Sequence, residues 1–162
     1  MEVKLVLLDP PGWHGLWSQG LPHWPYVQAV DQALTDRAIP PGIVRADVAL
    51  RAYHQTDRQD EIYMTLIWDV SRTGARGGVR LAWDDDTGWS YAKLGPSTHD
   101  VLLEAPVTPL HRVFADPGDV AEVADGLVRH WRTSDGDYGT EWDEASGVRN
   151  AIEALRRARV TE

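Results

Sequence analysis

Residues 61–94 constrain the fold most, because they contain the three clearest strand patterns in the chain. Apolar residues recur with a period of two over residues 62–68 and again over residues 79–83, which is typical of half-buried strands. An acidic turn, WDDDTGW, lies between Trp83 and Trp89 and leads into a third alternating run. These patterns predict an antiparallel meander in which the two tryptophans flank a tight turn.

Further strands are expected on both sides of this meander. Residues 3–8, VKLVLL, and residues 43–54 are predicted to form strands before it. Residues 101–107 are predicted to form a short strand after it. The meander is therefore expected to be the centre of a larger antiparallel sheet.

Three helices are predicted outside the strands. Residues 26–34 carry apolar side chains at helical spacing. Asp116 is a good N-cap for a second helix, with Pro117 at its first position. The last helix is predicted at residues 140–160, with Thr140 as its cap, acidic residues in its first turn and arginines at its end. This order of charges complements the helix macrodipole and stabilises the helix.

The expected fold is a single α+β domain over residues 1–162. Its antiparallel meander sheet has four to six strands and is covered mainly on one face by the N- and C-terminal helices, which leaves the other face or an edge available to a partner. A chain of 162 residues is long enough for one sizeable core and short for two. The predicted core includes Val48, Leu50, Met64, Leu66, Trp68, Leu81, Val120, Val123, Leu127 and Leu155.

Charge and composition exclude several classes of function. The chain has 25 acidic and 16 basic residues, a net charge of −9, which disfavours binding to nucleic acid or to an anionic membrane but suits a basic partner. It contains no cysteine, so disulfides, thiol nucleophiles and cysteine zinc sites are excluded. The apolar run at residues 5–8 is too short for a signal peptide or a membrane span, so a cytoplasmic protein is expected.

The loop at residues 10–26 is the main candidate for a binding site. It is rich in glycine, proline, tryptophan and histidine and shows no clear period. Its aromatic residues would form an interaction surface if exposed or a hydrophobic lid if folded onto the sheet. Its histidines lack the spacing and carboxylate partners of a metal site, so neither a metal nor a cofactor is predicted. The candidate binding residues are Trp13, His14, Trp17, His23 and Trp24.

Two charged segments invite a ligand but have simpler interpretations. The acidic turn at residues 84–88 lacks the alternating oxygen ligands of a calcium loop, and aspartate and glycine are ordinary turn residues. Arg72, Arg76 and Arg80 lie near the glycine-rich sequence TGARGG, which could cradle phosphate. That sequence lacks the Walker pattern, so a solvated hairpin loop is favoured.

No catalytic constellation is recognisable in the sequence. There is no GxSxG nucleophile elbow, and no GxGxxG motif follows a strand. The pair His99-Asp100 and the isolated His111 have no motif context. No catalytic residue is therefore predicted.

Residues 22–131 resemble a family of small uncharacterised actinobacterial domains of unknown function. The resemblance rests on a PYVQAVDQAL helix, a strand ending in LIWD, GWSYA after the acidic turn, and a proline-bearing lead into a VAEVADGLV helix. An actinobacterium, or one of its phages or plasmids, also fits the preference for arginine, because only Lys4 and Lys93 are lysine. The family has no assigned catalytic residues, so the resemblance implies none here.

Three functions are consistent with these observations. The leading hypothesis is a non-enzymatic protein-interaction or accessory protein that binds a protein partner or itself. The second is a small-molecule-binding protein or enzyme with a Trp/His-lined pocket, in which at least two of His14, His23, His99 and His111 converge. The third is an acidic decoy that mimics DNA, which requires carboxylates at phosphate-like intervals along one surface.

Overall fold

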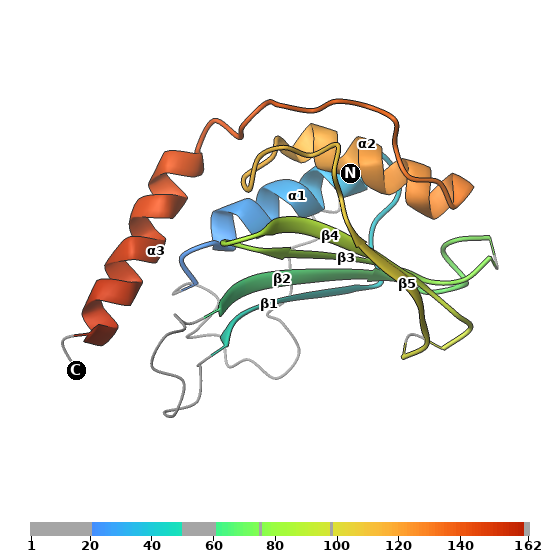
Figure 1. Ribbon diagram of the computed structural model, residues 1–162, viewed down its shortest axis with the longest axis horizontal. Coiled ribbons are helices and arrows are strands. Elements are labelled where there is room, and N and C mark those ends of the chain that lie inside the picture. Colours follow the sequence, from blue (N-terminus) through green and yellow to red (C-terminus); the bar gives the residue numbers. More distant parts are fainter. Residues whose placement is uncertain (1–20, 50–60, 75, 98, 161–162) are drawn as a thin grey trace, which may run out of the picture.

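The sheet is a five-stranded antiparallel meander. The structure is a computed structural model and describes residues 21–49, 61–74, 76–97 and 99–160. Within these residues each strand pairs with the next one along the chain, in the order β1-β2-β3-β4-β5 (Figure 1). The strands are β1 (Ile43–Ala49), β2 (Glu61–Trp68), β3 (Val79–Asp84), β4 (Gly88–Leu94) and β5 (Val101–Pro106). The predicted α+β meander is confirmed, while the strand expected at residues 3–8 lies outside the described residues.

One face of the sheet forms the floor of the core. In β2 the alternate residues from Ile62 to Trp68 are buried and the residues between them are half-buried. The same alternation continues in β3, where Leu81 lies opposite Leu66 of β2. The period of two in the sequence therefore separates a core face from a second face, as expected.

The acidic turn joins β3 and β4 with the predicted geometry. Trp83 lies directly opposite Trp89 in the register of the two strands, so both indoles belong to the core face. Gly88 has a φ of 79°, a left-handed conformation that glycine adopts without strain.

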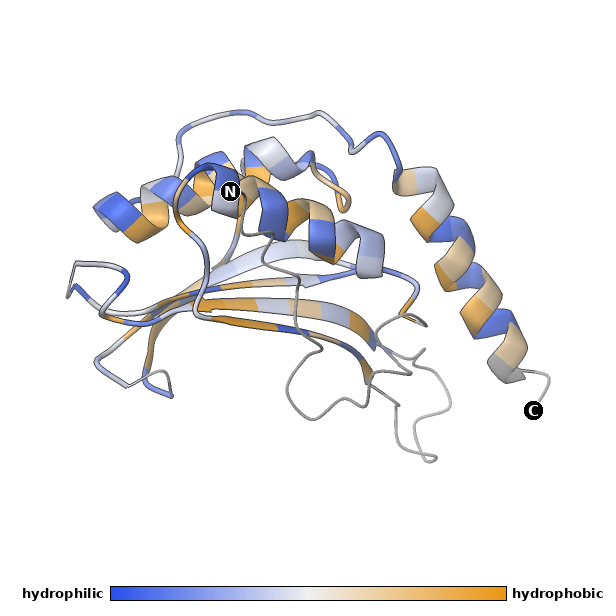
Figure 2. Cartoon of the chain, turned by 180° about the vertical axis from the view of Figure 1, so that it is seen from behind, coloured by the Kyte–Doolittle hydropathy of each residue, from blue (hydrophilic) through white to orange (hydrophobic). Residues whose placement is uncertain are grey.

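Two helices cover the core face of the sheet and a third lies beside it. α1 (Trp24–Asp36) and α2 (Pro117–His130) lie together over the sheet, whereas α3 (Ala145–Val160) lies beyond the end of these layers (Figure 1). Hydrophobic residues alternate with hydrophilic ones along all three helices, as expected for helices with one buried side (Figure 2). Among the described helices, none combines the length and the apolar character that crossing a bilayer requires.

The start of α2 agrees with its sequence signals. The Asp116 side chain accepts a hydrogen bond from the Gly118 N–H, and Pro117 is the first helical residue. α1 also carries a proline in its first turn, as predicted, but it begins at Trp24. Residues 24–26 are therefore helical and do not belong to the loop predicted at residues 10–26.

The predicted start of the last helix was wrong. α3 begins at Ala145, because residues before it pair with the segment that leads into α2. Glu141 forms a bridge with Ala115, and the carbonyl oxygen of Thr140 accepts a hydrogen bond from the Asp116 N–H. Thr140 is consequently not the N-cap. The acidic residues that were predicted to form the first turn of the helix, beginning with Glu141, lie before it.

Most of the predicted core is confirmed. Val48 and Leu155 are only partly buried against it, and Leu50 lies outside the described residues. The predicted residues that are buried are Met64, Leu66, Trp68, Leu81, Val120, Val123 and Leu127.

Candidate functional site

The structure places His23 and Trp24 with the core. His23 is fully buried, its Nε2 lies 2.7 Å from the carbonyl oxygen of Tyr63, and its ring stacks on Trp83. Trp24 is the first residue of α1 and packs, partly buried, against the core. Trp13, His14 and Trp17 lie outside the described residues. The proposal of an exposed aromatic surface in this loop therefore rests on those three residues.

The His23 ring is held in its neutral form. Burial lowers its pKa from 6.5 to about 4, although the Tyr63 carbonyl and the charges of Asp85 and Asp47 act in the opposite direction. A neutral ring that donates from Nε2 to the carbonyl has a bare Nδ1, and this buried atom has no hydrogen-bond partner. His23 is therefore a structural residue at neutral pH.

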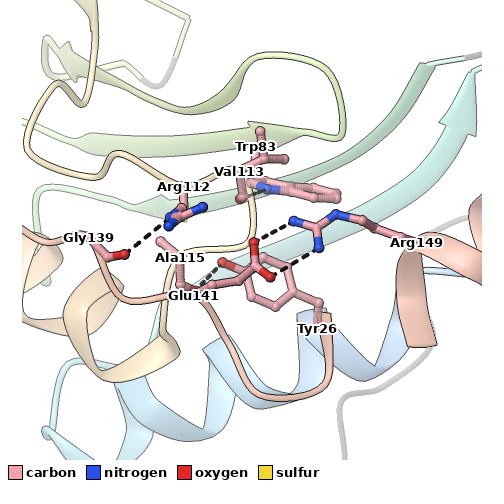
Figure 3. A network of polar contacts seen from close by, with 8 residues as sticks. All are labelled: Tyr26, Trp83, Arg112, Val113, Ala115, Gly139, Glu141 and Arg149. Carbon is pink, nitrogen blue, oxygen red and sulfur yellow. Dashed lines mark hydrogen bonds and ion pairs between the residues drawn. The ribbon is translucent and has the colours of Figure 1, made fainter. Parts of the chain in front are cut away.

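A buried aromatic network fastens the segment before α2 to the sheet (Figure 3). The Tyr26 hydroxyl donates to the carbonyl oxygen of Ala115 at 2.6 Å. It also accepts a hydrogen bond from Trp89 Nε1 at 3.2 Å. Trp83 Nε1 donates to the carbonyl oxygen of Val113 at 2.6 Å. Burial also raises the pKa of Tyr26 well above its usual value. The polar atoms of these rings satisfy buried backbone groups, which explains part of the high tryptophan content.

An ion pair between the segment before α3 and α3 itself holds the start of this helix (Figure 3). The two terminal guanidinium nitrogens of Arg149 donate to the Glu141 carboxylate, at 3.0 and 2.5 Å. The guanidinium also lies 5.1 Å from the centre of the Phe114 ring. Hydrogen bonds from Arg149 lower the pKa of Glu141. This pair connects α3 to the strand-like segment before it (Figure 3).

The acidic turn is a structural element. The Asp84 carboxylate accepts from the backbone N–H groups of Asp86 and Thr87, at 2.9 and 2.7 Å. Asp85 pairs with Arg156 of α3 at 2.6 Å, in a setting where both side chains are largely buried. The carboxylates thus close the turn and connect it to α3, as the turn interpretation predicts.

The Asp85–Arg156 pair is expected to contribute about 1–2 kcal/mol to stability, because it is more buried than a surface pair. A double-mutant cycle with Asp85→Ala and Arg156→Ala, followed by chemical denaturation, measures this coupling. Arg157 and Glu153 of α3, both well exposed, provide a control pair that should couple by less than about 0.5 kcal/mol. Equal coupling in the two cycles would contradict the tethering role of the turn.

The arginines near the glycine-rich loop do not form a common anion site in the described part of the chain. Arg72 donates to the carbonyl oxygen of Pro40 at 3.2 Å. Arg80 points elsewhere and pairs with Glu104 of β5 at 3.5 Å. Both side chains support the fold, which favours the hairpin-loop interpretation over phosphate binding.

The three candidate histidines that the structure describes lie in separate environments. His111 contacts Asp137 near the surface, His99 lies exposed between β4 and β5, and His23 is in the core. The described residues contain no group of three or more potential ligands that could hold a metal ion. The Trp/His-lined pocket gains no support from these three residues.

Among the described residues, the large apolar side chains that are exposed lie on β5, at the edge of the sheet. Val101, Leu102 and Leu103 are 46%, 66% and 47% exposed. The sequence of residues 101–107 predicts this strand but not its exposure. Pro106 at its end was an available signal, because proline within a sheet is largely confined to edge strands. We name the surface of residues 101–103 the β5 patch.

A groove lies where β5 and the segment after it face the C-terminal end of α2. Its volume is about 390 Å³, at the lower end of the range for ligand pockets. Apolar and polar groups share the surface of the groove almost equally, and hydroxyl groups and one carboxylate lie among the lining residues. These residues are Tyr91, Ala105, Pro106, Val107, Thr108, Pro109, Val123, Leu127, Thr133, Ser134 and Asp135.

Comparison with known protein families, curated proteins and solved structures finds no significant match to the chain.

Proposed function

We propose that this chain is a non-enzymatic protein-interaction or accessory protein of an actinobacterium or one of its phages or plasmids, and that it binds through the β5 patch. The observation that carries this proposal is the exposure of three consecutive apolar residues on an edge strand. Contiguous exposed apolar surface is costly in water and marks interaction sites. The occupant is a protein partner or a second copy of the chain.

We propose that the partner binds to the side chains of β5 and does not add a strand to the sheet. Lys93 pairs with Leu103 and Leu94 pairs with Val101, so Leu102 has no residue opposite it on β4. This bulge interrupts the regular spacing of backbone groups along the edge, and Pro106 removes one backbone donor. Both features are known to protect edge strands from pairing with another strand. The apolar side chains remain available.

The other candidate functions have less support in the described structure. A decoy that mimics DNA requires a row of carboxylates at phosphate-like intervals. The carboxylates that pair with arginines lie instead at dispersed positions, namely Asp85, Glu104, Asp125 and Glu141. Small-molecule binding is a second candidate, because the volume of the groove lies within the range of ligand pockets. Thermal-shift screening of small molecules tests it.

The β5 patch is tested with a double variant, Leu102→Ser with Leu103→Ser. We expect its free energy of unfolding to lie within about 0.5 kcal/mol of that of the parent, because both side chains are already exposed. It should lose self-association in sedimentation velocity, or lose the partner captured by the tagged parent. Leu102→Met with Leu103→Met is the matched control and should retain both, because it preserves apolar surface. Unchanged binding by the serine variant would reject the proposal.

The tryptophan loop requires a separate variant. Because Trp24 packs against the core, replacing it with alanine would mix an effect on binding with an effect on stability. The double variant Trp13→Ala with Trp17→Ala keeps Trp24 and tests whether the loop adds a second contact.

A further inference from the structure

We propose that the groove beside β5 is an anchor site that receives an apolar side chain of the protein partner, and that Asp135 selects a basic residue next to it. This inference rests on the proposed interaction function and specifies its partner. The occupant is a peptide segment in which an apolar residue is followed by arginine or lysine.

The apolar half of this recognition comes from the floor of the groove. Val123 and Leu127 of α2 are buried core residues, and Tyr91 of β4 also lines the groove. Prolines 106 and 109 line the wall. A volume of about 390 Å³ suits one or two side chains better than a large cofactor. Apolar anchors in such pockets supply much of the binding energy at protein interfaces.

The polar half comes from the segment after α2. Thr108, Thr133 and Ser134 provide hydroxyl groups, and Asp135 is the charged residue among those that line the groove. The Ser134 hydroxyl already lies 3.1 Å from the Tyr138 hydroxyl and accepts from the Gly136 N–H at 3.0 Å, so its position is fixed. The net charge of −9 attracts a basic segment over a longer range. A basic side chain therefore complements this end of the groove.

The groove and the β5 patch lie next to each other along β5. Ala105 and Pro106 line the groove and belong to the same strand as the patch. A six-residue strand spans about 20 Å, so one partner segment can reach both. This arrangement favours a protein partner over a small molecule, because a small molecule in the groove leaves the patch uncovered.

Two synthetic peptides test the inference on the full chain. Ac-Gly-Leu-Arg-Gly-NH2 and Ac-Gly-Leu-Glu-Gly-NH2 differ only in the charged residue, and amide NMR shifts report both site and affinity. We expect both to shift groove residues, with the arginine peptide about fivefold tighter, as expected for one hydrated ion pair. Asp135→Asn should remove this preference. Asp86→Asn removes the same charge in the exposed β3–β4 turn and should preserve it.

A third variant tests occupancy of the groove. Thr133 is exposed, so Thr133→Trp should fill the groove without disturbing the core and should abolish the shifts from both peptides. Equal affinities for the two peptides, equal effects of the two aspartate variants, or shifts away from the groove would overturn the inference. If the serine variant of the β5 patch loses its partner while the peptides bind equally, the interaction function stands and the anchor site fails.

Discussion

Replacing Tyr26 with phenylalanine is expected to lower the free energy of unfolding by about 2–4 kcal/mol. The substitution removes one oxygen atom and leaves the ring packing in place. Two buried groups then lose their partner, the carbonyl oxygen of Ala115 and the Nε1–H of Trp89. Each unsatisfied buried group costs about 1–3 kcal/mol, which makes this hydroxyl one of the most important single atoms in the core.

Chemical denaturation of parent and variant measures this loss. Tyr63→Phe is the matched control, because Tyr63 lies half-buried on the opposite face of the sheet. It should change stability by less than about 0.5 kcal/mol. Comparable losses in both variants would show that the Tyr26 network does not hold the segment before α2.

The free energy of unfolding is expected to fall by about 3 kcal/mol as the pH drops from 7 to below 4, because of the protonation of His23. The folded pKa of about 4 lies below the unfolded value of 6.5. Between these values the unfolded chain binds more protons than the folded chain, so stability rises with pH across this window. The contribution is fully present above pH 6.5 and is lost as the pH falls through about 4.

The variant His23→Gln isolates this effect. Glutamine cannot titrate but can still donate to the Tyr63 carbonyl, so the variant is less stable at pH 7 and its stability depends less steeply on pH. His99→Gln removes an exposed histidine and should leave the profile of the parent unchanged. If the His23 variant retains the full slope between pH 4 and 6.5, other groups cause the acid sensitivity.

Local sequence patterns predicted the elements whose signals are local. The strands β2 and β3 follow from alternating apolar residues, and the start of α2 follows from Asp116 and Pro117. The turn at Gly88 follows from a glycine at a position that needs positive φ. Such features depend on a few neighbouring residues and can therefore be predicted without knowledge of the tertiary structure.

Elements set by distant contacts could not be predicted in this way. The acidic cluster that begins at Glu141 is typical of the first turn of a helix. In the structure, however, Glu141 forms a bridge with Ala115 and an ion pair with Arg149. His23 lies in a segment with no period, and its burial depends on Tyr63, forty positions along the chain. Long-range pairing overrides local propensity in both cases.

The candidate binding site in the structure differs from the loop predicted from the sequence for a similar reason. Exposure of the β5 patch depends on where the helices end, because α1 and α2 cover the sheet without covering its β5 edge strand. The groove is formed by residues from β4, β5 and α2 and the segments that follow β5 and α2. Its lining residues show no common spacing in the sequence. Pro106 and the run of three apolar residues were the only local indications.

The most direct test of the interaction function is a footprint of the protein with and without its captured partner. Hydrogen exchange and carbene labelling report backbone and side-chain protection at the same residues. The proposed contact predicts protection of residues 101–109 and 133–135, with the exposed surface of α1 unchanged. Protection confined to the opposite face of the sheet or to residues 10–26, with residues 101–109 unprotected, would contradict it.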